Sequence, residues 1–108
     1  MENITLEFIS DRDLYQSYMP FMKNGGLFVR TTQHFDLSTD IKLIVTLPDS
    51  LESSEIIGKV SWVTPIGVQN GTPAGIGVSF VEDPDNIRNQ IDKAIGRLLN
   101  SSEPTLTM

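Results

Sequence analysis

The chain has 108 residues and a formal net charge of −6, and its composition is that of an ordinary globular protein. The length fits one domain with a modest core, and the negative charge argues against a general attraction to nucleic acid or anionic lipid. Because the chain has no cysteine, a disulfide framework, a thiolate metal site and a cysteine nucleophile are excluded.

Targeting signals are not evident in the sequence. The first residues lack a basic stretch followed by an apolar run, and no apolar stretch approaches the roughly 20 residues that span a bilayer. Because zero cysteines also fit a reducing compartment, we expect a cytoplasmic protein. The three Asn-x-Ser/Thr triplets at Asn3, Asn70 and Asn100 are then chance occurrences. Residues 1–100 are expected to form one domain, followed by a flexible tail over 101–108.

The N-terminal quarter is predicted to contain a strand, a short helix and a turn. Residues 5–9 alternate weakly and favour a first strand. Ser10 can cap a helix, and Pro20 would end it because the residue before proline avoids the helical region. The run Asn24, Gly25 and Gly26 tolerates a left-handed backbone, so the chain is expected to turn there.

Aromatic and methionine side chains are concentrated just before this turn. Tyr15, Tyr18, Met19 and Met22 lie on roughly one side at helical spacing. This side could cover one end of a sheet, which is the favoured interpretation. It could also form a partly exposed surface for a partner, since aromatic residues and methionine are enriched at such contacts.

Four further strands are predicted over residues 26–31, 41–47, 56–64 and 75–81, separated by polar loops. The two middle strands are expected to pair in antiparallel fashion through a short link. In the strand over 56–64, strict alternation places Trp62 on the same face as Ile56 and Val60. A tryptophan on that face favours the core over a contact with a partner.

The strand over 75–81 has one bulky face and one nearly bare face. Ile76, Val78 and Phe80 form the bulky face, and the opposite face carries only glycines and Ser79. Such a face admits close approach of another backbone or a ligand, although a bend in the sheet is the favoured interpretation.

The last predicted element is an amphipathic helix. Asp83 is the expected N-cap, Pro84 the first helical residue and Asp85 a member of the acidic first turn. Its apolar stripe consists of Ile87, Ile91, Ile95, Leu98 and Leu99. A stripe of only about two heptads favours covering the sheet over a coiled coil. Together these elements predict a mainly β fold, a small antiparallel β-barrel with a C-terminal helix.

Neither catalysis nor a metal or cofactor site is expected from the sequence. His34 is the only histidine and stands in a polar loop, where a solvated side chain is the common outcome. No glycine-rich loop carries the lysine and hydroxyl of a phosphate-binding loop, and the carboxylates are scattered singly or in pairs.

Four stretches, KNGGLFVRT, KLIVTLPDS, GKVSWVTP and AGIGVSFVED, resemble in order and spacing the PilZ domain family. The resemblance covers about residues 6–99. It implies a small antiparallel β-barrel with a C-terminal helix, and most members of the family are bacterial receptors for cyclic di-GMP. In that family an Arg-x-x-x-Arg motif and an Asp/Asn-x-Ser-x-x-Gly motif hold the dinucleotide.

The chain departs from both ligand motifs. Alignment on Gly26 places Phe21 at the acid or amide position and Lys23 at the serine position, and Gln16 stands four residues after Arg12. The pair of guanidinium groups that would bind a dianion in bidentate fashion is therefore missing. These degenerate positions imply weak or absent direct binding of cyclic di-GMP.

The closer similarity is to the divergent type IV pilus branch of this family. Its members resemble the chain in carrying Tyr-x-x-Tyr-Met-Pro-Phe before Lys-x-Gly-Gly. This implies a non-catalytic adaptor for pilus biogenesis and twitching motility that contacts a PilB-type ATPase and the EAL domain of a FimX-type protein. The implied docking residues are Tyr15, Tyr18, Met19, Pro20 and Phe21, with Trp62 as a further candidate. The alternatives are a direct receptor for cyclic di-GMP and an uncharacterised enzyme.

Overall fold

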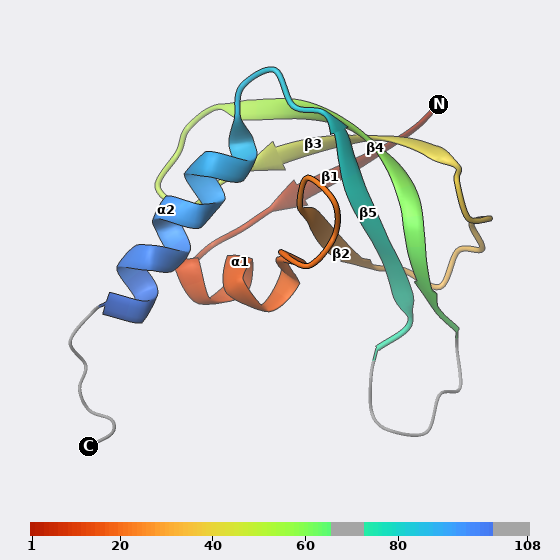
Figure 1. Ribbon diagram of the computed structural model, residues 1–108, viewed down its shortest axis with the longest axis horizontal. Helices are drawn as coiled ribbons and strands as arrows, with labels where there is room; N and C mark the ends of the chain where they lie inside the picture. Colours follow the sequence, from red (N-terminus) through yellow and green to blue (C-terminus); the bar gives the residue numbers. More distant parts are fainter. Residues whose placement is uncertain (66–72, 101–108) are drawn as a thin grey trace.

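The computed structural model describes residues 1–65 and 73–100. In chain order the elements are β1 (Glu2–Glu7), α1 (Asp11–Ser17), β2 (Gly26–Arg30), β3 (Asp40–Thr46), β4 (Ser53–Thr64), β5 (Gly75–Glu82) and α2 (Ile87–Asn100). The strands form one sheet in the order β1-β3-β4-β5-β2, which curls into a half-barrel with both helices toward one end (Figure 1). The predicted mainly β fold with a C-terminal helix is confirmed. The predicted tail and the middle of the predicted loop over 64–74 lie outside the described residues.

The pairing of β1 differs from the antiparallel expectation. β1 runs parallel to β3, with Leu6 opposite Val45, whereas the other three pairings are antiparallel. A parallel pairing needs a long connection, and α1 with β2 supplies it here. Within the described residues, β1 and β2 each pair with one strand of the sheet, so both are edge strands.

One apolar cluster fills the concave side of the sheet. It combines buried side chains of all five strands or their ends with Leu14 of α1 and with Ile87, Ile91 and Ala94 of α2. The predicted role of the last helix as a cover for the sheet is therefore confirmed. Leu99, at the end of the predicted stripe, is 65% exposed, so the apolar contact of α2 comes from its first three turns.

The start of α2 differs from the sequence prediction. The helix begins at Ile87, and Pro84 and Asp85 lie in a turn before it, so neither belongs to a first helical turn. Asp83 still caps the helix, because its carboxylate oxygens accept the backbone N–H groups of Ile87 at 2.7 Å and Arg88 at 2.9 Å. A left-handed Asn86 (φ 54°) lets the chain make this extra turn.

Replacing Asp83 by alanine is expected to lower the free energy of unfolding by about 1 kcal/mol, the typical cost of losing an N-cap. The two N–H groups of α2 would lose the carboxylate that accepts them. Urea denaturation followed by circular dichroism measures the change. Asp83→Asn should lose less stability than Asp83→Ala, because its single amide oxygen can still accept one of the two N–H groups. An Asp83→Ala variant as stable as the wild type would contradict the assignment.

Candidate functional site

The segment between α1 and β2 folds over the outer, convex face of the sheet. α1 ends at Ser17, Tyr18 forms an isolated bridge with Leu27, and the backbone N–H of Met19 donates to the Gly26 carbonyl at 2.9 Å. The prediction that the side chains from Tyr15 to Met22 share one side of a helix is therefore wrong. The helix ends at Ser17, and Tyr18 pairs with β2 instead.

The predicted glycine turn is confirmed. Asn24 (φ 64°) and Gly25 (φ 82°) adopt the left-handed backbone, while Gly26 already belongs to β2. The methionines before this turn return over the sheet. A Cβ on Gly77 would lie 2.8 Å from both Met19 Sδ and Met22 Cε. Methionine side chains therefore pack against the bare face of β5 at Gly77. The sequence had suggested either a bend in the sheet or the close approach of another backbone or a ligand.

Trp62 lies on the outer face, not in the core, so the predicted core position is wrong. The register of β4 against β5 shifts between Val60 and Trp62: Val60 pairs with Val78 and Trp62 already pairs with Gly77. This irregularity adds one residue to β4 and moves Trp62 to the face opposite Val60. Its side chain is 50% exposed, and its indole N–H donates to Thr64 Oγ1 at 2.9 Å.

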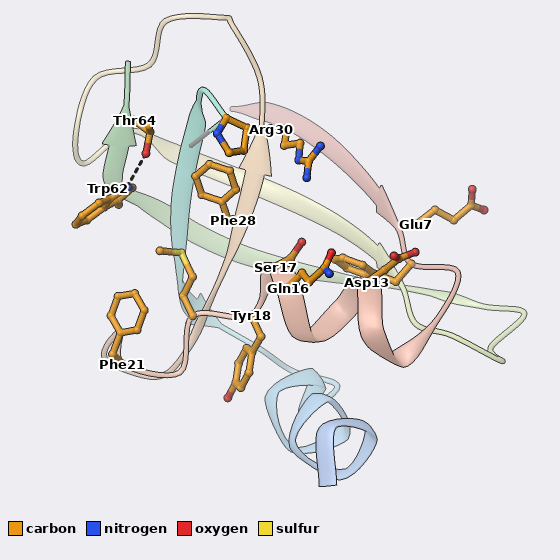
Figure 2. A pocket seen from close by; sticks show the side chains of 13 residues that line it. Glu7, Asp13, Gln16, Ser17, Tyr18, Phe21, Phe28, Arg30, Trp62 and Thr64 are labelled. Atoms are coloured by element: carbon orange, nitrogen blue, oxygen red, sulfur yellow. Dashed lines mark hydrogen bonds between the residues drawn. The ribbon is translucent and has the colours of Figure 1, made fainter. Parts of the chain in front are cut away.

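These elements enclose a groove of about 910 Å³ on the outer face, which we call the outer groove. It is lined by Glu7, Phe8, Asp13, Gln16, Ser17, Tyr18, Met19, Phe21, Phe28, Arg30, Trp62, Thr64 and Pro73. Its volume lies in the range typical of ligand sites. In Figure 2 the rings of Trp62, Phe28 and Phe21 lie toward one end, and the carboxylates of Glu7 and Asp13 lie toward the other.

The charges of the outer groove are mixed. Arg30 brings one guanidinium, while Glu7 and Asp13 bring two carboxylates, and none of these three side chains forms an ion pair with another described residue. Phe21, at the other end of the groove, is 73% exposed. A site with more acidic than basic groups and several exposed rings suits an apolar or basic surface better than a dianion.

The structure brings together some of the predicted docking residues. Tyr18, Met19, Phe21 and Trp62 line the outer groove, whereas Tyr15 and Pro20 are exposed outside it. Tyr15 nevertheless presents a large side chain, 49% exposed, on α1.

The positions of the degenerate nucleotide motifs are scattered. Of Arg12, Phe21, Lys23 and Gly26, only Phe21 lines the outer groove. Arg12 and Lys23 are exposed, and Gly26 is buried. A side chain at Gly26 would also be obstructed, because a Cβ there would meet Met22 Sδ and the Val78 carbonyl at 2.7 Å.

Sequence reasoning missed Phe28 and Arg30 on β2 and the carboxylates of Glu7 and Asp13. A signal for the first two existed: alternation with the buried Leu27 and Val29 places them together on the opposite face. Glu7 and Asp13 belong to two other elements, and only the curl of the sheet brings them to the groove.

Tyr18 joins the outer groove to α2. Its ring lines the groove and its phenol donates to Asp92 Oδ1 at 2.8 Å. Burial of the ring, followed by the hydrogen bond to Asp92, raises the pKa of the Tyr18 phenol above its ordinary value of 10.0, and the nearby Arg88 guanidinium partly opposes this.

A Tyr15→Phe variant leaves Tyr18 as the only tyrosine, so its absorbance at alkaline pH reports Tyr18 alone. We expect its ionisation to be centred above pH 10. Because the folded state raises this pKa, the associated stability is fully present below the unfolded pKa and is lost as pH rises through the folded one. Tyr18→Phe is the control that removes this pH dependence. A midpoint at or below pH 10 would contradict the assignment.

The described residues offer little evidence for a metal site or for a membrane-spanning helix. No group of three or more His, Asp or Glu side chains within it could hold a metal ion. His34 forms an exposed pair with Asp36, at 2.9 Å. None of the described helices is both long and apolar enough to cross a bilayer.

Comparison with known families gives a match over almost the whole chain. The PilZ domain family matches residues 2–97, a span that contains every strand and most of α2. A search of curated proteins found no match. PilZ domains are generally non-catalytic domains that bind proteins or cyclic di-GMP, so the comparison directs attention to binding at the outer groove.

Proposed function

Since the chain belongs to the PilZ domain family, we propose that it is a non-catalytic adaptor that binds partner proteins at the outer groove. One observation carries this proposal: the groove pairs three exposed or half-exposed rings, those of Phe21, Phe28 and Trp62, with more carboxylates than guanidinium groups. Aromatic side chains are enriched at protein interfaces and supply most of the binding energy where they anchor in a partner.

We assign the adaptor to type IV pilus biogenesis and twitching motility, with a PilB-type ATPase and the EAL domain of a FimX-type protein as partners. Support comes from the Tyr-Met-Pro-Phe segment, which forms one wall of the outer groove through Tyr18, Met19 and Phe21. The assignment places the chain in the cytoplasm, which agrees with the absence of cysteine.

The second candidate function is direct reception of cyclic di-GMP. Arg30 favours it, because a guanidinium beside the Phe28 ring could contact a phosphate while a base stacks. A single guanidinium in a groove that also contains the carboxylates of Glu7 and Asp13 is a poor substitute for two, since the carboxylates repel the dianion. We therefore expect weak or absent binding of the dinucleotide.

Calorimetric titration tests both functions. The protein is titrated first with cyclic di-GMP and then, separately, with the PilB-type ATPase and with the EAL domain loaded with the dinucleotide. The adaptor function predicts binding of at least one protein and little heat from the free dinucleotide. Micromolar or tighter binding of free cyclic di-GMP, without binding of either protein, would favour the receptor. A Tyr15→Ala variant then shows whether the exposed ring on α1 belongs to the interface.

A further inference from the structure

The strand edge that borders the outer groove already has a neighbour. Tyr18 forms an antiparallel bridge with Leu27 of β2. The same register places Phe28 opposite Ser17, the last residue of α1. An occupant of the groove is therefore recognised by the side chains that line it, and not as a strand added to β2 at this point.

Two of these side chains are hydrogen-bond donors without an acceptor. Gln16 of α1 and Arg30 of β2 line the groove, and neither side chain bonds to another described residue. By contrast, the Tyr18 phenol and the Trp62 indole already donate within the chain. A side-chain amide carries two N–H donors and a guanidinium carries five. The groove therefore suits an occupant that presents free carbonyl groups.

The available backbone conformations differ in how many carbonyl groups they leave free. In a helix the carbonyls are used internally, except in the last turn. In a polyproline II segment there are no internal hydrogen bonds, so the carbonyls remain available. A proline also has no N–H group that would need an acceptor in the groove. The unpaired donors of Gln16 and Arg30 thus favour a polyproline II segment over a helix.

The aromatic end of the groove suits proline side chains. Phe21 and Trp62 are exposed and Phe28 is half-buried, and all three line the groove. Proline-rich segments dock into grooves lined by aromatic rings, and their preformed backbone loses little conformational entropy on binding.

The acidic end of the groove adds a basic residue to this segment. Neither Glu7 nor Asp13 has an ion-pair partner among the described residues, although both line the groove. In Figure 2, Gln16 and Arg30 lie between these carboxylates and the aromatic rings. A lysine or arginine of the occupant would pair with the carboxylates, and the net charge of −6 favours a basic segment as well.

We propose that the outer groove binds a proline-rich segment of a partner protein in the polyproline II conformation, an inference that rests on the adaptor function. The prolines pack on Phe21, Phe28 and Trp62, and carbonyl groups of the segment accept hydrogen bonds from Gln16 and Arg30. A lysine or arginine beside the prolines pairs with the carboxylates at the other end of the groove.

The probe is a phage-displayed library of random dodecapeptides, panned against the full chain. We expect enriched peptides that contain prolines and a lysine or arginine. Fluorescence anisotropy with such a peptide should show a loss of at least about tenfold in affinity when its prolines are replaced by alanine, because the fixed φ is lost and new N–H groups appear. Failure to enrich peptides, or enriched peptides without proline, would overturn the proposal.

A substitution at Gln16 tests the hydrogen bonds to the segment. Gln16→Ala should weaken the selected peptide about fivefold, the typical worth of one hydrogen bond. Asn89→Ala is the matched control, because Asn89 is exposed on α2 and does not line the outer groove. Thermal melts verify that both variants keep the fold. Equal affinities for Gln16→Ala and Asn89→Ala would refute the role of this donor and, with it, the argument for polyproline II.

A substitution at Asp13 tests the basic residue. Asp13→Asn should weaken a selected peptide that carries lysine or arginine, and should leave the version of that peptide with alanine at the basic position unchanged. Equal losses for the two peptides would contradict the ion pair.

Competition separates this proposal from the adaptor function. The selected peptide at saturating concentration should displace the EAL domain or the ATPase from the chain. If either protein binds and the peptide does not displace it, the adaptor function stands and the proline-rich occupant is refuted. If the peptide binds and neither protein does, the assignment to these partners fails and the peptide site stands.

Discussion

A Trp62→Ala variant is expected to bind the protein that occupies the outer groove about 30-fold more weakly, a loss of about 2 kcal/mol. The indole is 50% exposed on the outer face, although Met19 and Met22 pack closely over the neighbouring Gly77. A large ring held in place by its hydrogen bond to Thr64 loses little conformational entropy on binding. Calorimetry or fluorescence anisotropy with each proposed partner measures the change.

Stability should respond much less than binding to this substitution. Trp62 lies outside the buried cluster, so we expect the urea midpoint to stay close to that of the wild type. Val81→Ala is the matched control for binding, because Val81 is 52% exposed on β5 but does not line the outer groove. If Trp62→Ala binds both proteins as tightly as Val81→Ala does, the outer groove is not the interface.

The exposure of Trp62 illustrates what the sequence could not predict. Alternation is a local rule, and it placed Trp62 correctly relative to Val60 for a regular strand. The shift that reverses its face depends on how β4 meets β5, and these strands are joined by a long loop. The existence of the five strands was predictable because each strand carries its own pattern, whereas their order in the sheet was not. The first residues of β4 were missed because their pairing with the end of β3, Thr46 opposite Ser53, is not visible in their polar composition.

The candidate site was predictable only in part for the same reason. The aromatic segment before the glycine turn is continuous in sequence, so its concentration of rings was evident. The acidic end of the groove joins Glu7 at the end of β1 with Asp13 on α1, and Arg30 comes from β2. No local pattern connects these three residues. Their proximity results from the parallel return of β3 against β1 and from the curl that follows.

The other large expected effect is a loss of stability where β4 and β5 approach each other most closely, at Gly58. A Gly58→Ala variant is expected to lose about 2–4 kcal/mol of unfolding free energy, as overpacked cores do. The added methyl group would lie 2.5 Å from the Ser79 carbonyl oxygen and 2.6 Å from Val78 Cγ1. A backbone oxygen cannot rotate aside as a side-chain tip can, so the two strands must separate.

Gly96→Ala is the control for Gly58→Ala. The same added methyl group should raise the unfolding free energy at Gly96 and lower it at Gly58. Gly96 lies inside α2, and nothing stands within 4 Å of a Cβ built on it. Alanine should therefore raise the unfolding free energy by about 1 kcal/mol through its helix propensity. Urea denaturation of both variants measures the pair. Equal stabilities for the two variants would mean that β4 and β5 do not approach as closely at Gly58 as the structure has them.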